Sequence, residues 1–239
     1  MDSRVSLQPA YVLHRLAFQN TSLLVDFFTL DFGKVRAVAK GVRSAKSKYR
    51  PLLQLFQPVL VSFSGRSEMK TLTGIESSVC AMALQGERLF SGLYVNELLV
   101  RLLHNHVEHE ALYKNYQDTL IALQGSSGIE VILRRFELNL LAELGYGINL
   151  DSDCLTHAPI DESVSYRFTP DIGFEQVSEV AGESASSRVF RGEHIIALRE
   201  FALNDKSTAK SAKKLLRMAL GAHLGEKPLM SRSLFAHKT

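Results

Sequence analysis

The sequence predicts an α+β protein, in which a five-stranded barrel precedes a mainly α-helical domain and a small irregular C-terminal region. Residues 1–80 contain short apolar segments separated by glycine and proline, which is typical of β-strands. From Gln85 onward, apolar residues recur at helical spacing, which indicates amphipathic helices. Residues 150–191 are polar and irregular. With 239 residues, of which 46% are hydrophobic, the chain can bury a sizeable core.

Five strands are expected in residues 1–80, with breaks at Gly33, Gly41, Pro51 and Gly65. Five short strands that carry a basic loop fit a small closed barrel of the OB type. An SH3-like barrel fits the same pattern nearly as well. The expected strands span residues 10–18, 22–30, 34–40, 53–63 and 68–79.

The third expected strand alternates charged and apolar residues. Lys34, Arg36 and Lys40 lie at even spacing, so they share one face of the strand while apolar residues occupy the other. Residues 31–33 read Asp-Phe-Gly, a composition suited to the turn that precedes this strand. We therefore predict a hairpin with one buried face and one basic face.

Basic residues continue into the loop after this strand. Between Asp31 and Glu68 the sequence has no carboxylate, so these cations have no acidic neighbour in the chain. Such a surface indicates a polyanionic partner. Tyr49 is the best candidate for stacking on a base, whereas core packing is favoured for Phe27 and Phe28. The residues predicted to contact DNA here are Lys34, Arg36, Lys40, Arg43, Lys46, Lys48, Tyr49 and Arg50.

Three helices after the barrel are expected to pack as a bundle, at residues 85–103, 108–123 and 129–144. Short strands and further helices are expected between residues 150 and 239. We predict three domains on this basis. They are an OB-fold nucleic-acid-binding domain at 1–80, a helical bundle at 81–149, and an irregular insert with C-terminal helices packing on the bundle at 150–239.

The charge distribution also suggests separate modules. Residues 1–80 carry 11 Lys and Arg against 5 Asp and Glu, and residues 201–239 carry 8 against 2. The middle of the chain is acidic, with 9 against 18 in residues 81–200. We predict that the last long helix contributes to holding a second DNA strand, through Lys210, Lys213, Lys214 and Arg217.

Two adjacent arginines interrupt an apolar helical run. Arg134 and Arg135 lie beside large apolar residues, which suits a partner peptide that carries both apolar side chains and a carboxylate. Pairing of the arginines within the helix or across the bundle is an equally good interpretation. The residues assigned to peptide binding are Leu133, Arg134, Arg135, Phe136 and Leu140.

The chain offers no convincing catalytic constellation, since nucleophile-elbow, Walker-type and His-Glu-x-x-His motifs are all absent. His104, His106 and His109 cluster at a predicted helix end, where histidines are more often solvated than metal-bound. Cys154 and His157 make only half of a zinc-type ligand set. We predict no cofactor and no metal.

The expected compartment is the cytoplasm. Only two cysteines occur, which suggests a reducing environment and no disulfide framework. The N-terminus lacks the apolar core of a secretory signal, and no apolar run approaches the roughly 18 residues of a membrane span. We therefore expect no membrane partner.

Five segments, taken together and in order, resemble the RecO family of bacterial recombination mediators. The similarity runs over nearly the whole chain and is far more specific than the basic loop alone. The segments are FQNTSLLV at 18–25, GKVRAVAKGVR at 33–43, GRSEMKTL at 65–72, SGLYVNELL at 91–99 and RRFELNLLAELGYG at 134–147.

The resemblance implies an N-terminal OB-fold, a central helical domain and a C-terminal region that closes on it. It also implies binding to single- and double-stranded DNA, annealing of complementary strands, and partnership with RecR. Such proteins engage the C-terminal tail of single-stranded DNA-binding protein and help load RecA, and no chemical step is attributed to them. The basic residues at 34–50 match the family's DNA-contacting region, and Arg134, Arg135 and Phe136 match its tail-holding segment.

One departure from the family pattern concerns zinc. Many relatives carry four cysteines as a zinc site after the Gly-Tyr-Gly segment, whereas only Cys154 falls in that region here. The expectation of no metal follows from this as well.

We expect a nucleoid-associated protein that is a monomer when alone.

Two other function classes compete with DNA annealing. A protein-interaction scaffold of a DNA repair complex would bind partners without touching DNA. A nuclease would need clustered metal-binding carboxylates, which the basic segments lack.

Overall fold

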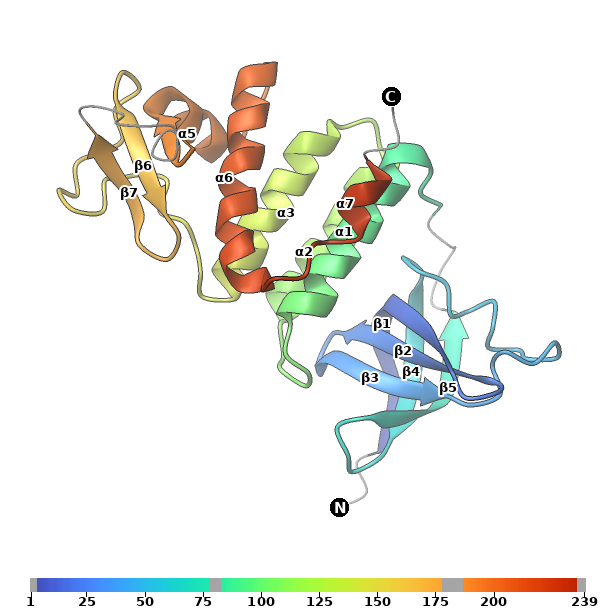
Figure 1. The fold of residues 1–239 in the computed structure, drawn as a ribbon. Coiled ribbons are helices and arrows are strands. Elements are labelled where there is room, and N and C mark those ends of the chain that lie inside the picture. Colours follow the sequence, from blue (N-terminus) through green and yellow to red (C-terminus); the bar gives the residue numbers. More distant parts are fainter. Residues whose placement is uncertain (1–3, 78–82, 178–186, 236–239) are drawn as a thin grey trace. The chain divides into compact units, whose positions relative to one another are not determined.

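The computed structural model describes residues 4–77, 83–177 and 187–235 of the chain (Figure 1). The chain divides into two compact units. The first comprises residues 1–126 together with 228–239, and the second comprises residues 127–227. The chain therefore leaves the first unit, forms the second, and returns to the first.

The first unit begins with a closed five-stranded barrel (Figure 1). Its strand order is β1-β2-β3-β5-β4, in which β3 and β5 run parallel and the other neighbours antiparallel. This is the predicted OB-fold barrel, and the SH3-like alternative is excluded by the strand order. The strands are β1 (Arg4–Phe18), β2 (Ser22–Thr29), β3 (Gly33–Ala39), β4 (Pro58–Ser64) and β5 (Lys70–Ser77).

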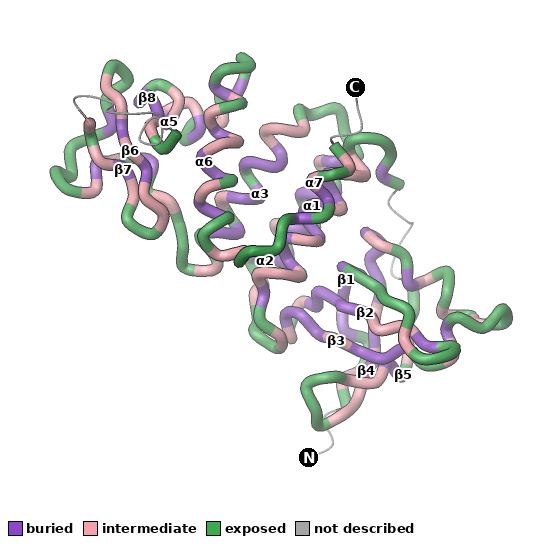
Figure 2. Tube along the Cα trace, in the orientation of Figure 1, coloured by how far each residue is buried: buried purple, intermediate pink, exposed green. Residues whose placement is uncertain are grey.

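The barrel interior is filled by alternate residues of its strands. Val12, Val25, Phe27 and Val35 are all fully buried in one cluster, as expected for β-branched and aromatic side chains on the inner face. Phe28 points to the opposite side of β2 and is also fully buried, so both phenylalanines are core residues as predicted. Figure 2 shows how much of the barrel strands is buried.

Phe28 is buried because helices cover that side of the barrel within the first unit. The helices are α1 (Gly86–Leu102) and α2 (Glu110–Gln124). Tyr113 and Tyr116 of α2 lie with their ring centroids 5.5 and 6.0 Å from that of Phe28, and both also contact Tyr11 of β1. These four rings meet at angles between 49° and 76°, the tilted arrangement that aromatic quadrupoles favour.

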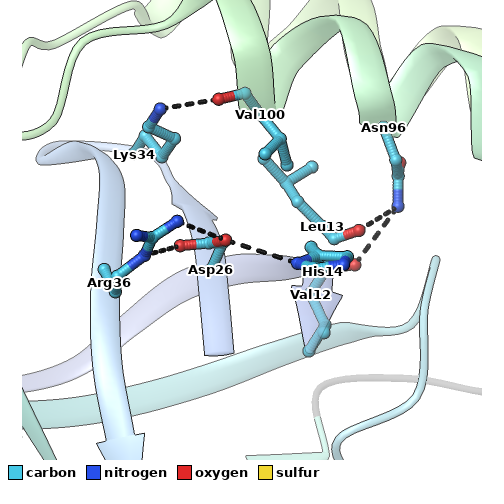
Figure 3. Close-up of polar contacts among 8 residues, drawn as sticks. All are labelled: Val12, Leu13, His14, Asp26, Lys34, Arg36, Asn96 and Val100. Atoms are coloured by element: carbon cyan, nitrogen blue, oxygen red, sulfur yellow. Dashed lines mark hydrogen bonds and ion pairs between the residues drawn. The ribbon is translucent and has the colours of Figure 1, made fainter. Parts of the chain in front are cut away.

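A bulge in β1 supplies the polar link between barrel and helices. The β1–β2 register shifts between Val12 and His14, which leaves Leu13 without a ladder partner in β2. The buried amide of Asn96 in α1 donates to the Leu13 carbonyl at 2.9 Å (Figure 3). The same amide accepts a hydrogen bond from the Tyr116 hydroxyl at 2.7 Å. One side chain therefore joins β1, α1 and α2.

The C-terminal segment returns to α1. The Glu97 carboxylate accepts hydrogen bonds from the backbone N–H groups of Met230 and Ser231, each at 2.8 Å, and from the Ser231 hydroxyl. Arg101 of α1 donates to the Pro228 carbonyl at 3.2 Å. A short helix, α7 (Ser231–Leu234), begins at this point and lies along α1 (Figure 1). The carboxylate serves as its N-terminal cap.

The second unit combines helices with a small antiparallel sheet. The sheet has the order β7-β6-β8, and Phe168, Phe174 and Phe190 form its buried aromatic core. Helices α3 and α6 contact one another, as do α5 and α6. The elements are α3 (Ile129–Glu143), β6 (Ser165–Thr169), β7 (Gly173–Val177), β8 (Val189–Arg191), α5 (Gly192–Arg199) and α6 (Lys206–Leu224).

Several element boundaries differ from the sequence-based expectation. Strand β1 starts at Arg4, six residues before the expected start at residue 10, and β4 starts at Pro58 rather than residue 53. Strand β8 was not expected. The predicted end of the fifth strand, residues 78–79, lies outside the described residues. The compact units group α3 with α6 rather than with α1 and α2, and the expected three-domain division stays a prediction.

Replacing Asn96 by alanine should destabilise the first unit. The Leu13 carbonyl and Tyr116 hydroxyl would lose their partner inside the protein, and each such loss costs about 1–3 kcal/mol. We expect the free energy of unfolding, measured by urea denaturation, to fall by at least about 2 kcal/mol. The control is Gln117→Ala at an exposed position of α2, which should stay within about 0.5 kcal/mol of wild type. Equal stability of the two variants would contradict this role for Asn96.

Candidate nucleic-acid interface

Lys34, the first predicted DNA contact, is buried instead of exposed. Its ammonium donates a hydrogen bond of 2.8 Å to the Val100 carbonyl in the last turn of α1 (Figure 3). The last carbonyls of a helix lack N–H partners, and a cation there also complements the helix dipole. Burial lowers the pKa of Lys34 below its ordinary value, against an opposing effect of Asp26. Lys34 is therefore a capping residue of α1, and the expectation that it faces solvent is wrong.

Gly33 shows how closely the chain approaches this point. It has a φ of +56°, and a Cβ built there would lie 1.7 Å from the Val107 carbonyl oxygen. The N–H of His106 donates to the Lys34 carbonyl at 2.9 Å, which holds the segment after α1 against the start of β3. Only glycine fits this position.

Arg36 is also engaged inside the protein. Its guanidinium makes two hydrogen bonds to the Asp26 carboxylate, 2.6 Å from Nε to Oδ1 and 3.1 Å from Nη2 to Oδ2 (Figure 3). His14 Nδ1 lies 3.6 Å from the same carboxylate. The three residues stand opposite one another on β1, β2 and β3. Burial raises the pKa of Asp26, but the hydrogen bonds from His14 and Arg36 outweigh it and leave the pKa below its usual value.

The remaining cations of this region do face solvent. We define the basic loop as the five exposed cations at the end of β3 and in the β3–β4 connection, which is largely exposed in Figure 2. Within the described ranges none of the five pairs with a carboxylate, and the Arg43 guanidinium donates to the Gln19 carbonyl at 3.3 Å. The members of the basic loop are Lys40, Arg43, Lys46, Lys48 and Arg50.

Tyr49 lies in the same connection but is half-buried against the barrel core. Its carbonyl accepts the N–H groups of Leu52 and Leu53 at 3.0 and 3.2 Å, so it also starts a helical turn. The structure thus gives Tyr49 a packing role, and its predicted stacking on a base stays a prediction.

The four predicted cations of α6 lie together on one side of that helix. Lys210 and Arg217 are exposed, whereas Lys213 and Lys214 are half-buried. The Lys213 ammonium lies 3.2 Å from Glu130 of α3. The Lys214 ammonium lies 4.8 Å from the centroid of the Phe190 ring, in a cation–π contact.

Arg188, just before β8, lines the same pocket as the α6 cations. Sequence reasoning missed it, because it stands alone among small residues and more than twenty positions before Lys210. No spacing signal could have found it, since the sheet and helix that bring it into place are far apart in sequence.

The two arginines of α3 differ in their surroundings. Arg134 is buried, and its Nη2 donates to the buried Glu137 carboxylate at 2.7 Å, while its Nη1 lies 3.5 Å from Glu130. Arg135 is exposed, with its guanidinium carbon 4.8 Å from the centroid of the Phe201 ring. Leu133, Phe136 and Leu140 are buried in the core. The pairing interpretation therefore holds for Arg134, and only Arg135 of this set faces solvent.

Comparison with known families decides what kind of protein carries these surfaces. The family model for the N-terminal part of recombination protein O matches residues 1–79, and the model for its C-terminal part matches residues 83–233. The chain belongs to the RecO family of DNA repair proteins. The resemblance in the sequence is thereby confirmed, and with it a place in DNA repair and recombination.

Curated relatives match along nearly their whole length. The DNA repair protein RecO of Coxiella burnetii (strain RSA 331 / Henzerling II) is 42% identical over 234 residues, covering 98% of this chain and 99% of the relative. RecO of Pseudoalteromonas atlantica is 43% identical over 225 residues, covering 94% and 92%. RecO of Salmonella dublin is 42% identical over 229 residues, covering 95% and 93%.

The segment after the Gly-Tyr-Gly motif, where the family resemblance raised the question of a zinc site, is organised around a carboxylate. Asp153 accepts the backbone N–H groups of Leu155 and Thr156, both at 2.8 Å, and that of Gln176 in β7 at 2.7 Å. These hydrogen bonds lower the pKa of Asp153 to about 2. Cys154 next to it is a free thiol. In the described residues no three His, Cys, Asp or Glu side chains come together as metal ligands.

One of the three histidines near the end of α1, His106, contacts the barrel. His106 Nε2 lies 2.9 Å from the Glu68 carbonyl.

No helix in the described part of the chain combines the length and apolar character needed to cross a bilayer. The predicted absence of metal, cofactor and membrane partner stays a prediction.

Replacing Asp26 by asparagine should weaken the barrel in a pH-dependent way. The carboxylate has a lowered pKa in the folded state and a pKa near 3.9 when unfolded, so it stabilises the fold above about pH 4. We expect a loss of about 1–3 kcal/mol at pH 7, since Arg36 loses a charged partner. That loss should shrink as the pH falls below about 4, because the unfolded carboxyl takes up a proton first, and it should vanish once the pH is below the lowered pKa of the folded carboxyl.

Urea denaturation of both proteins between pH 3 and pH 7 measures this difference. The matched control is Asp31→Asn, a change at an exposed position in the turn after β2. A difference between wild type and Asp26→Asn that stays constant with pH would contradict the pairing argument.

Proposed function

We propose that this RecO-family protein is a non-enzymatic recombination mediator that binds single- and double-stranded DNA and anneals complementary strands. The observation that supports it most is the basic loop, whose five cations are exposed and have no carboxylate partner in the described residues. The α6 cations provide a second basic surface. The protein acts in the cytoplasm at the nucleoid, as a monomer when alone.

Free cations bind phosphates at a lower cost than paired ones. A cation that binds a phosphate releases counterions from the DNA, and this release drives binding at low salt. A cation already held by a carboxylate, such as Arg36, would first have to give up that partner. The proposed DNA contacts on the barrel are therefore those of the basic loop, without Lys34 and Arg36.

Annealing requires no reacting group. Two DNA strands repel one another, and cations that hold the backbone of each strand reduce that repulsion. Phosphate contacts leave the base edges free to pair. In this proposal the basic loop holds one strand and the α6 cations contribute to holding the second.

Membership of the RecO family supports a set of protein partners. In this proposal the protein acts with RecR to help load RecA on DNA coated with single-stranded DNA-binding protein. It recognises the C-terminal tail of that protein through the exposed Arg135, because a guanidinium can form two parallel hydrogen bonds with a terminal carboxylate. The buried Arg134 keeps a structural role in α3.

Reversing three charges of the basic loop tests DNA binding. Arg43→Glu, Lys46→Glu and Lys48→Glu together should lower the affinity for a single-stranded oligonucleotide by about a hundredfold at low salt. The slope of log affinity against log salt should fall by about 2, since each lost phosphate contact removes about 0.7 for single strands. Fluorescence anisotropy at a series of salt concentrations measures both quantities.

The control for net charge is a triple reversal elsewhere, Arg167→Glu, Arg191→Glu and Arg199→Glu. These arginines already lie close to carboxylates, so they offer no free cation. This control should retain most of the affinity. An unchanged affinity in the basic-loop variant would place the DNA site elsewhere, and absence of salt-dependent DNA binding in the wild type would favour the interaction scaffold.

Replacing Arg135 by alanine tests tail recognition. We expect about tenfold weaker binding of an acidic peptide with a free terminal carboxylate, because a charged hydrogen-bond pair is lost. Affinity for bare DNA should not change. Arg191→Ala, at another exposed arginine, serves as the matched control.

Arg134→Ala should behave differently from Arg135→Ala. It leaves the buried Glu137 carboxylate without this partner, so we expect about 3–5 kcal/mol lower stability in urea denaturation.

Equal loss of peptide and DNA binding in Arg135→Ala would show that this variant also acts through stability, and would remove the case for a peptide site.

A further inference from the structure

The second unit contains a pocket of about 670 Å³ between α6 and the sheet connections. Its walls come from α6, from Pro170 after β6, and from Ser187 and Arg188 just before β8. The size falls within the range of pockets that hold small organic ligands. The α6 residues that line it are Lys210, Lys213, Lys214, Arg217, Met218 and Ala222.

The charge of the pocket is strongly positive. Four cations follow one another along α6 at helical spacing, over a rise of roughly 10 Å from Lys210 to Arg217. Arg188 adds a fifth from the side of the sheet. Among the described residues that line the pocket there is no Asp or Glu, and the Lys213 ammonium is paired with Glu130 of α3. The pocket therefore suits a ligand that carries more than one negative charge.

Apolar residues stand among these cations. Pro170, Met218 and Ala222 give the pocket an apolar wall that a row of phosphates alone would not contact. A ligand that fits the whole pocket must present negative charge and a flat or compact apolar group close together. An unpaired nucleotide has this combination, since each phosphate is followed by a base with an exposed apolar face.

We propose that this pocket receives an unpaired nucleotide of a single DNA strand, with the base against Met218, Ala222 and Pro170 and the flanking phosphates on the surrounding cations. The inference rests on the proposed function, because it assigns a ligand to the second basic surface. A base pair in a duplex cannot fill the pocket, since its bases are stacked inside the helix. The pocket consequently distinguishes single-stranded from double-stranded DNA.

The state of Lys214 agrees with an anionic ligand. Burial first, and the neighbouring Lys210 second, lower the pKa of Lys214. A phosphate between the two ammonium groups would relieve their repulsion. Lysine ammonium groups and arginine guanidinium groups both bind phosphate oxygens, so all five cations of the pocket suit the phosphates that flank a nucleotide.

Three probes of equal length separate base contact from phosphate contact. They are a single-stranded oligonucleotide, the same strand with abasic sites in place of its bases, and a duplex. Their affinities for the full-length protein are measured by fluorescence anisotropy. We expect the wild type to bind the normal single strand more tightly than the abasic strand.

Two variants address the two halves of the pocket. Met218→Gln keeps the side-chain length but removes the apolar surface, and should weaken binding of the normal strand about fivefold while the abasic strand and duplex change less than twofold. The triple variant Lys210→Gln, Lys214→Gln and Arg217→Gln should weaken binding of all three probes. Leu155→Gln, at an exposed apolar residue outside the pocket, is the matched control and should leave all affinities unchanged.

Each other outcome overturns a distinct part of the argument. If the triple variant weakens binding of all probes but Met218→Gln affects none, α6 binds phosphates only and the nucleotide pocket is wrong. If neither variant changes any affinity, the α6 surface does not bind DNA, and the proposed function fails in that part. If an acidic peptide binds in a Met218-dependent way and the oligonucleotide does not, the occupant is a peptide.

Discussion

A single buried amide links the barrel to both of the helices that cover it in the first unit. The bulge in β1 leaves the Leu13 carbonyl without a ladder partner, and Asn96 of α1 supplies the missing hydrogen bond while it accepts the Tyr116 hydroxyl of α2. Lys34 adds a second link between β3 and α1 at the end of that helix. The basic loop starts where β3 ends. Its position therefore depends on Asn96 and Lys34, whose hydrogen bonds lie inside the protein and hold the barrel to α1.

The barrel was predictable because its pattern is local. Alternating apolar residues and glycine breaks identify the strands, and Phe27 and Phe28 were placed in the core for the same reason. Whether Lys34 and Arg36 face solvent depends on tertiary contacts. Even spacing puts them on one face of β3, but it carries no information that α1 ends over Lys34 or that Asp26 stands opposite Arg36. A charged strand face is exposed only where nothing else covers it.

The second unit shows the same limit more strongly. Arg134 and Arg135 are neighbours in sequence, yet successive helix positions point about 100° apart, so one is buried between Glu130 and Glu137 and the other faces solvent. The sequence left both interpretations open because it did not show which side of α3 meets α6. Arg188 and the pocket depend on a strand, β8, that is three residues long and has no detectable pattern.

The return of the chain to α1 has a consequence for truncated forms of the protein. Residues 228–235 belong to the first unit, where Glu97 and Arg101 hold their backbone and Phe235 contacts Phe90. A frameshift or nonsense codon at about residue 228 would therefore remove the segment that packs on α1, in the unit that contains the barrel. The contacts within residues 127–227 would stay complete. The lost hydrogen bonds would therefore affect α1, far from the truncation in sequence, since Glu97 and Ser231 are 134 positions apart.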